Sequence, residues 1–558
     1  MGGRKHTYGD ASIFTLCPPL SFPILLPVTP APPPSHFLSW ATTPRATILF
    51  IFFLALIRLL YLFFYCPYNL IEDEAHYWEW SRHLDWSYYS KGPGVAWTIF
   101  ASTKLLGTSE FAVRITAPLF SAITAYAIAR LTKEISSDWR AGFIAAVLFT
   151  CAPALQITGL LFLIDGPYCA FWSLAALASY CALFRQSASA WLALGAAIAA
   201  GFIFKYTILL FLPGFILFAI FNRKTISLHP QSKLLIPVSL ILASLGLAPI
   251  LIWNSQHDWV TIRHLLGHLG IQGGDTPVSQ GSGTGYHYNP LWTLDYIIAQ
   301  FAFLGGTCAA VIAALFAIRR SRTPQSTFLV FLAAPIFIFY FLVSFITEPE
   351  GNWAIGGLIT LFPLAALWLL PRLDAFTLSP TTPSPANGFY KTAIVIGIIS
   401  GMLMLRLDSI DLILTKIGVP EKIQRIIPMG RLTGAPEQAL NVARIIDVLK
   451  KKTDKEPFII TQHYGRASQI AFYLPNQPRN LVYCASAYTG GRTTQYDLWP
   501  QASLKDPTLL GRPAILLGGD QSGSEWAKAF GSVTPLGTLD GDRKKNRPAF
   551  SGLDYRGW

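Results

Sequence analysis

The chain has 558 residues, of which 52% are hydrophobic and 13% are charged, and its formal net charge at pH 7 is +13. A soluble domain usually carries about 25% charged residues, so this composition argues against a soluble protein and favours one with several membrane spans. The basic residues lie mainly in short loops between apolar runs, which argues against nucleic acid as a partner. The seven cysteines show neither CxxC nor CxxH spacing, so no zinc site is predicted.

The chain begins with a proline-rich segment, residues 1–46, which contains nine prolines. Because that density prevents a continuous helix, we expect neither a span nor a signal peptide here, but a disordered tail or a start assigned too far upstream. Apolar runs of nearly membrane-spanning length then recur through residues 47–406. They predict eleven transmembrane helices, at residues 47–66, 110–131, 140–159, 167–184, 189–204, 206–222, 233–253, 291–318, 326–347, 353–370 and 389–406.

The basic residues between these spans predict the orientation. With a cytoplasmic N-terminus, each inner segment between spans is basic, as the positive-inside rule requires; these segments carry Lys133, Arg185, Arg223, Lys224, Arg319, Arg320, Arg322 and Arg372. An odd number of spans then places residues 407–558 outside the cytoplasm. The same orientation places the loops 67–109 and 254–290 outside, so we expect the working face to be extracytoplasmic.

From residue 407 onward the chain becomes charged and mixed, and its apolar runs become short. Such runs predict buried strands, and the segments between them predict helices. We therefore expect residues 407–558 to form a small extracytoplasmic α/β domain on a mainly α, polytopic membrane protein. The predicted strands are Phe458–Thr461, Leu481–Cys484 and Ala514–Gly518, and the predicted helices are Arg466–Leu474 and Glu525–Phe530.

The first outer loop carries the strongest chemical signal, a run of three acidic residues at positions 72–74. Asp73, Tyr77, Trp80 and Leu84 recur at helical spacing, and Trp and Tyr prefer the membrane interface. A helix on the bilayer surface would hold these acidic groups at the depth of a lipid headgroup. The alternative is an ordinary interfacial anchor with solvated carboxylates, but three adjacent acidic groups are more than an anchor needs.

Three further charged residues stand at unusual positions. Lys91 precedes a Gly-Pro-Gly turn, where it is suited to holding a phosphate; the alternative is a lysine that extends to the interface. Lys205 interrupts an apolar stretch, where a charge is costly and by default functional. Asp165 lies at the outer end of an apolar hairpin, and its alternative role is to cap a helix.

Taken in order, these motifs resemble a known family. Asp73-Glu74 and Tyr77-Trp78-Glu79 followed by Lys91-Gly92-Pro93 resemble the first outer loop of membrane glycosyltransferases with a GT-C fold. Within these enzymes, the sequence resembles the bacterial relatives of protein O-mannosyltransferases. This group includes lipid A aminoarabinose transferases and lipopolysaccharide-core galacturonosyltransferases. Further matching elements are Leu163–Pro167, Phe204–Thr207, Trp253–Trp259, Gly351–Trp353, Ala471–Pro475 and Gln495–Trp499.

The resemblance implies a function. It implies a sugar transferred from a polyprenyl-phosphate donor to a hydroxyl of an envelope acceptor, which is lipopolysaccharide or lipid A, another glycan or a protein. It implies an inner-membrane, multi-pass enzyme with Asp73 as catalytic base, since an attacking hydroxyl must lose its proton. It adds Asp165 as a second active-site carboxylate and Lys91 as the phosphate contact. The residues expected to bind substrate are Glu74, Tyr77, Lys91, Lys205, His257 and Arg263.

A metal is left open. Some relatives bind a divalent cation near the lipid phosphate, and His257, His264 and His268 stand at roughly helical spacing. In the aminoarabinose-transferase branch the residue before the equivalent of Lys91 is acidic, whereas Ser90 stands here. This difference weakens the case for a carried-over metal.

Two other functions fit a polytopic basic protein. A transporter or flippase of lipid-linked sugars predicts ionisable residues near the middle of spans and inverted repeats; the sequence shows no such repeat, and its acidic cluster lies in a loop. A non-catalytic protein that binds envelope glycans through its outer loops would not need the aspartate and lysine roles.

Overall fold

The computed structural model describes residues 38–271, 274, 288–378, 384–424, 427–520, 522–539 and 547–558. Most of the predicted tail 1–46 lies outside the described residues, as do positions 272–273 and 275–287 of the predicted outer loop 254–290. The first long helix begins at Pro44, three residues before the predicted start of the first span.

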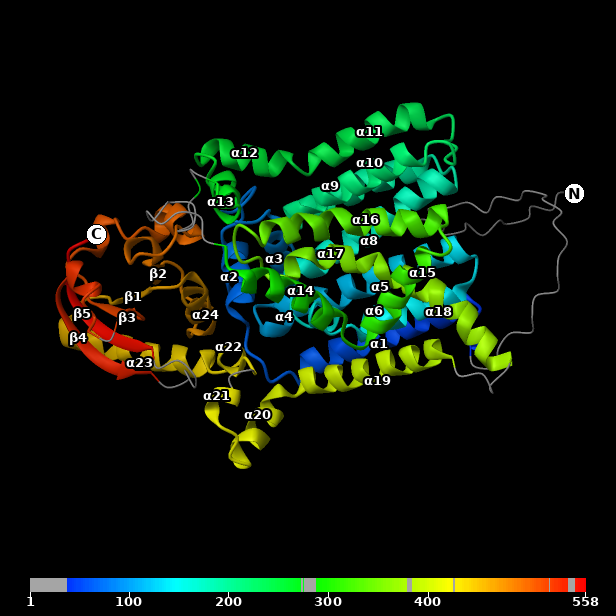
Figure 1. Ribbon diagram of the computed structural model, residues 1–558. Helices are drawn as coiled ribbons and strands as arrows, with labels where there is room; N and C mark the ends of the chain where they lie inside the picture. Colours follow the sequence, from blue (N-terminus) through cyan, green and yellow to red (C-terminus); the bar gives the residue numbers. More distant parts are fainter. Residues whose placement is uncertain are drawn as a thin grey trace, which may run out of the picture.

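The helical part is a bundle of long helices that run side by side, with a smaller sheet domain at one end (Figure 1). Its helices are α1 (Pro44–Phe64), α2 (Glu72–Arg82), α3 (Gly94–Leu106), α4 (Glu110–Arg114), α5 (Thr116–Ser136), α6 (Trp139–Cys151), α7 (Pro153–Ile157), α8 (Asp165–Phe184), α9 (Ser189–Phe204), α10 (Phe211–Phe221), α11 (Ser232–Leu245), α12 (Ala248–Gln256), α13 (Val260–His268), α14 (Pro290–Leu304), α15 (Cys308–Ile318), α16 (Pro324–Val343), α17 (Ile355–Ile359), α18 (Leu361–Leu378) and α19 (Pro385–Leu405).

Seven helical segments in the described part of the chain are long and apolar enough to cross a membrane. An eighth is a pair, Gly351–Ile359 and Leu361–Thr377, bent by 47°. The other three predicted spans coincide with shorter apolar helices, Trp139–Cys151, Ser189–Phe204 and Tyr206–Phe221. The polytopic helical architecture is therefore confirmed, while the count of eleven spans stays a prediction.

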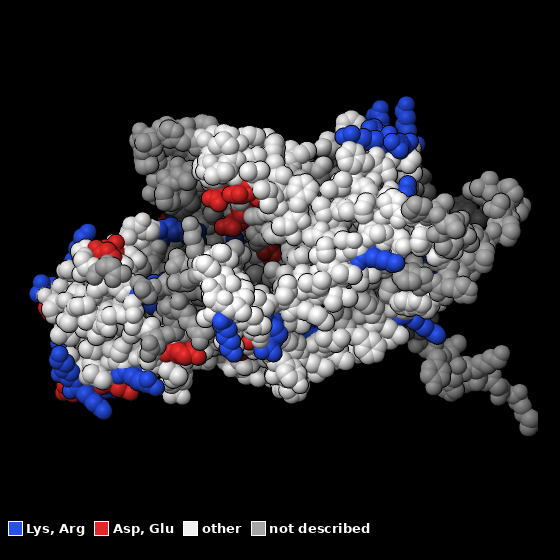
Figure 2. Space-filling view, turned by 60° about the horizontal axis from the view of Figure 1, so that its bottom comes forward, with Lys and Arg blue, Asp and Glu red and all other residues white. Residues whose placement is uncertain are grey.

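The outside of the bundle is apolar, as a lipid-facing surface requires. On α1 the side chains of Phe52, Phe53 and Phe63 are more than half exposed. Figure 2 shows the middle of the bundle largely free of charge, with lysine and arginine side chains gathered at the end away from the sheet domain. Near the end of α5, Glu134 pairs with Arg130 at 2.8 Å and Arg185 at 3.1 Å.

The C-terminal region folds around a five-stranded sheet with the order β2-β1-β3-β5-β4. β1 pairs in parallel with β2 and β3, and β5 pairs antiparallel with β3 and β4. The elements are α20 (Leu407–Lys416), α21 (Glu421–Gln424), α22 (Met429–Leu432), α23 (Ala435–Thr453), β1 (Phe458–Thr461), α24 (Tyr464–Tyr473), β2 (Val482–Cys484), β3 (Ala514–Leu517), β4 (Phe530–Thr538) and β5 (Pro548–Tyr555).

The three predicted strands correspond to β1, β2 and β3, and the first predicted helix corresponds to α24. Only a three-residue 3₁₀ helix, Trp526–Lys528, forms where the second was predicted. The sequence did not reveal β4, because its residues are mostly exposed and include glycine and proline, so it forms no apolar run. The small α/β domain is confirmed.

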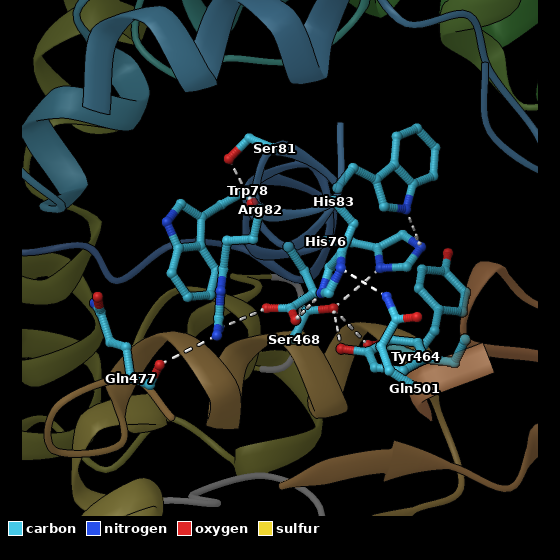
Figure 3. Close-up of polar contacts among 12 residues, drawn as sticks. His76, Trp78, Ser81, Arg82, His83, Tyr464, Ser468, Gln477 and Gln501 are labelled. Atoms are coloured by element: carbon cyan, nitrogen blue, oxygen red, sulfur yellow. Dashed lines mark hydrogen bonds and ion pairs between the residues drawn. The ribbon is translucent and has the colours of Figure 1, made fainter. Parts of the chain in front are cut away.

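The helix predicted in the first outer loop is α2, but it does not lie free on a bilayer surface. It is held between the bundle and α24, and most of its residues are buried. His76 Nδ1 lies 3.0 Å from Ser468 Oγ, and Arg82 donates to the carbonyl of Gln477 at 3.1 Å (Figure 3). Through α2, residues 67–109 therefore link the two parts of the molecule.

Candidate active site

A cavity of about 470 Å³ lies where one end of the bundle meets the C-terminal domain. Figure 2 shows the surface hollowed between these two parts, with acidic side chains around the hollow. The charged lining comprises four basic and three acidic residues, which suits an anionic ligand. The lining residues are Asp73, His76, Tyr77, Tyr89, Ser90, Lys91, Leu163, Ile164, Asp165, Lys205, His264, His268, Glu350, Asn352, Trp353, Arg431, Tyr464, Arg492, Thr493, Thr494 and Gln495.

Asp73 lies in the first turn of α2, and its side chain is open to the cavity. The surrounding protein removes most of the bulk water around the carboxyl group, and this desolvation raises the pKa of Asp73 above its ordinary value. The positive charge of Lys91 opposes the rise in pKa, and Glu72 adds to it. A carboxylate with a raised pKa accepts a proton more readily, which is the property of a general base.

Lys91 lies in a loop that packs tightly against the end of α9. A Cβ atom at Gly92 would lie 2.3 Å from the carbonyl oxygen of Ile203, so only glycine fits there. Burial, together with the nearby Lys205, lowers the pKa of Lys91 to about 8, while the charge of Asp73 acts in the opposite direction. Among the described residues its ammonium group has neither a hydrogen bond nor an ion pair, so it is available to a ligand.

Asp165 and Lys205 form a buried pair in the cavity wall. Lys205 Nζ donates to Asp165 Oδ1 at 2.6 Å, and Asn352 Nδ2 donates to Asp165 Oδ2 at 2.8 Å. Lys205 Nζ also lies 5.1 Å from the ring centre of Tyr168. Because both oxygens of Asp165 have partners, this carboxylate is better suited to positioning Lys205 than to taking a proton.

The C-terminal domain supplies cations that sequence reasoning missed. Arg492 donates to His264 Nε2 at 3.1 Å and lies over the rings of Tyr89 and Tyr464, at 5.9 and 5.6 Å from their centres. Arg431, in α22, lines the cavity near Asp73. In the sequence, Arg492 directly follows Gly490 and Gly491. Nothing in that pattern indicates that Arg492 reaches the cavity beside α2.

Comparisons with known proteins agree with this architecture. Residues 90–253 match the family model described as dolichyl-phosphate-mannose-protein mannosyltransferase. The lipid A galacturonosyltransferase RgtD of Rhizobium johnstonii is 27% identical over 334 residues, which cover 59% of this chain and 66% of that relative. ArnT from Cupriavidus metallidurans matches with a TM-score of 0.59 over 91% of this chain and 98% of that one. Its apo and undecaprenyl-phosphate-bound structures are 15% and 14% identical to this chain.

This chain has the GT-C fold of the ArnT structures, and its sequence is similar to that of membrane glycosyltransferases. It is a multi-pass membrane protein with the fold that the motifs at residues 73–93 indicated. The GT-C fold brings together five of the eight predicted site residues in one cavity, namely Asp73, Tyr77, Lys91, Asp165 and Lys205.

Glu74 is placed differently from the prediction of substrate contact. It is fully buried on the side of α2 that faces the bundle, and it accepts hydrogen bonds from Arg114 Nε at 2.8 Å and Arg114 Nη2 at 2.6 Å. The backbone N–H of Phe162 also donates to it, at 3.0 Å. Both carboxylate oxygens of Glu74 are thus occupied by hydrogen bonds within the protein.

His257 and Arg263 also lie outside the residues that line the cavity. The ring of His257 stacks on Trp253 with centroids 4.0 Å apart, and Nδ1 lies 2.8 Å from the Trp253 carbonyl. Arg263 is exposed and donates to the carbonyl of Asp258 at 2.7 Å. Arg492 of the C-terminal domain lines the cavity, whereas His257 and Arg263 do not.

The three histidines expected at helical spacing do not gather. His264 and His268 face each other at 3.1 Å between Nε2 atoms, whereas His257 stacks on its own helix. Within the part of the chain that the structure describes, no group of three or more His, Cys, Asp or Glu side chains is arranged to hold a metal ion. Within the described ranges, the side chains around His264 and His268 therefore do not form a site for a divalent cation.

Proposed function

We propose that this cavity transfers a sugar from a polyprenyl-phosphate donor to a hydroxyl group of an envelope acceptor at the extracytoplasmic face. The observation that carries the proposal is the combination of Asp73, open to the cavity, with Lys91 and the Lys205–Asp165 pair in the same wall. A base beside a set of cations is what transfer from a phosphate leaving group requires.

Asp73 acts as the general base. The acceptor oxygen attacks the anomeric carbon while its proton passes to the Asp73 carboxylate. The bond between the anomeric carbon and the phosphate oxygen breaks, and its electron pair stays on the polyprenyl phosphate. Attack from the face opposite the leaving group inverts the anomeric carbon. Negative charge near the sugar also stabilises an oxocarbenium-like transition state.

The basic residues hold the phosphate. Lys91 has no partner among the described side chains and meets the phosphate directly, with Lys205, fixed by Asp165, and Arg492 as further cations. Arginine and lysine bind phosphate through charge-assisted hydrogen bonds, which are about twice as strong as neutral ones. These cations stabilise the charge that develops on the departing phosphate, so no proton donor is needed there.

The nature of the relatives supports this choice of donor and acceptor. One relative is described as acting on lipid A, and the structure of another holds undecaprenyl phosphate. Nucleotide sugars are not supplied outside the cytoplasm, so a lipid-carried donor fits a cavity on that face. We propose accordingly that the N-terminus is cytoplasmic and that residues 407–558 lie outside, as the basic inner loops favour.

The test is sugar transfer by the purified full chain in nanodiscs, with undecaprenyl-phosphate-linked sugars as donors and lipid A as acceptor. We expect Asp73→Asn to lower turnover about 10²–10⁴-fold, the usual contribution of a general base, without loss of folded protein. Asp258→Asn is the matched control, because Asp258 is an exposed outer-loop aspartate away from the cavity lining. Near-normal turnover by Asp73→Asn contradicts the proposal. If the wild type binds the lipid-linked sugar but forms no product, the alternative function as a flippase is favoured.

A further inference from the structure

A second pocket lies beside the first turn of α2. It is lined by three arginines, Arg431, Arg466 and Arg547, with Gln438 and Gln469, and by one carboxylate, that of Glu72. Its volume is about 30 Å³, enough for a small group and too little for a sugar ring. Arg431 lines this pocket and the main cavity alike, so the two adjoin.

The charge of the pocket favours an anion. Among the described residues, Glu72 is the one carboxylate in the lining, and it lies 3.8 Å from His463 Nδ1 and 4.0 Å from Arg547 Nη1. Arg466 is buried and donates through Nε to Gln438 at 3.2 Å. The 19-residue helix α23 begins at Ala435 in the same wall, and the positive end of its dipole adds to the field of the arginines. Three guanidinium groups around so small a space match the oxygens of one phosphate group.

The segment just before this pocket points to a membrane lipid as the source of that anion. α20 and the residues after it project from the body between α19 and α22 (Figure 1). Four apolar side chains on this arm are more than half exposed: Leu412, Ile413, Ile417 and Ile423. Because the arm follows directly from the last long apolar helix, α19, these side chains suit the interfacial layer of the bilayer. Arg431 comes eight residues after Ile423 along the chain, in α22.

The position of the pocket relative to Asp73 gives the anion a role. Glu72, which lines the second pocket, and Asp73, which lines the main cavity, are adjacent on α2. Arg431 also lines the main cavity together with Asp73, and its charge opposes the rise in the pKa of Asp73. A group fixed by the three arginines would therefore hold a nearby hydroxyl of the same molecule at Asp73.

We propose that the arginine pocket binds a phosphate group on the acceptor, and that the acceptor is a phosphorylated lipid of the outer leaflet that enters along the α20 arm. This inference rests on the proposed function, and it separates two anion sites. The donor phosphate meets Lys91 in the main cavity, and the acceptor phosphate meets Arg431, Arg466 and Arg547.

The test is equilibrium binding to the full chain in nanodiscs, with three probes: phosphorylated lipid A, the same lipid A after phosphatase treatment, and undecaprenyl phosphate. We expect the wild type to bind phosphorylated lipid A about tenfold or more tightly than the dephosphorylated form, the effect of one lost charge-assisted contact. Arg547→Gln should remove most of that preference and leave the affinity for undecaprenyl phosphate unchanged. Arg466→Lys, which keeps the charge and loses the paired geometry of a guanidinium, should reduce the preference in the same direction.

Arg556→Gln is the matched control, since Arg556 is an exposed arginine of the same domain that pairs with Asp554 away from the pocket. Equal binding of the two lipid A forms by the wild type overturns the inference. So does a loss of undecaprenyl-phosphate affinity in Arg547→Gln, which would assign the pocket to the donor. Absence of sugar transfer by a wild type that keeps the phosphate preference would contradict the proposed function and not this pocket.

Discussion

Asp73 and Glu74 are neighbours on α2, yet the regions they face differ in almost every respect. On one side, Asp73 opens into a cavity beside a lysine that has no partner among the described residues. On the other, Glu74 is fully buried and is bound by the guanidinium of Arg114 through two hydrogen bonds and by a backbone N–H. Hydrogen-bond satisfaction, and not charge or position in the sequence, separates the carboxylate that can act on a ligand from the one that holds the fold.

The largest effect that would sharpen this comparison is on stability. Glu74→Gln leaves Arg114 buried without its counter-charge, and breaking such a pair usually costs about 3–5 kcal/mol. We expect a clearly lower melting temperature in nanodiscs, whereas Glu72→Gln, at a half-exposed neighbour, should change stability by less than about 0.5 kcal/mol. An unchanged melting temperature in Glu74→Gln would remove the distinction between the two sides of α2.

The next effect concerns the unpaired cation of the cavity. Lys91→Met should weaken binding of undecaprenyl phosphate by about 1.5–3 kcal/mol, the usual contribution of a hydrogen bond to a charged group, and leave the melting temperature unchanged. Lys104→Met is the control, because Lys104 lies on α3 outside the main cavity. Equal affinity of Lys91→Met and the wild type would show that the phosphate does not meet this lysine.

A smaller effect concerns pH. The charge of Lys91 is present below its pKa of about 8 and is lost as the pH rises through that value, so kcat/KM should fall above pH 8, approaching about tenfold per pH unit. Lys91→Arg should abolish this alkaline fall, because arginine stays charged. At the acid end, kcat/KM should fall as Asp73 is protonated, at a higher pH than for an ordinary aspartate because its pKa is raised. An alkaline fall that persists in Lys91→Arg would assign it to another group.

The smallest effect tests whether Asp165 acts through Lys205. In a double-mutant cycle with Asp165→Asn and Lys205→Met, kcat/KM should show a coupling energy of about 1 kcal/mol. Once one partner of the Lys205–Asp165 hydrogen bond has been replaced, replacing the other should lower kcat/KM little further. Strict additivity of the two substitutions would mean that Asp165 acts independently, for example as a second catalytic carboxylate.

Much of this site could be predicted from the sequence, since the predicted spans put Asp73, Lys91, Asp165 and Lys205 at the same end of the bundle, where the structure brings them together. Glu74 shows where that reasoning ends. Adjacent residues on a helix point about 100° apart, so one of them faces the cavity and the other faces Arg114, and spacing does not say which. The contribution of Arg492 could not be predicted, because it depends on how the C-terminal domain docks on α2 and α13.

The most direct test of the central claim is an experimental structure of the Asp73→Asn protein with an undecaprenyl-phosphate-linked sugar. We predict a phosphate oxygen at about 3 Å from Lys91 Nζ, which is hydrogen-bond distance. The anomeric carbon should lie next to the substituted side chain at position 73, with room for an acceptor oxygen between them. A phosphate bound outside this cavity, or a sugar held on the side of α2 that faces Arg114, would contradict the account.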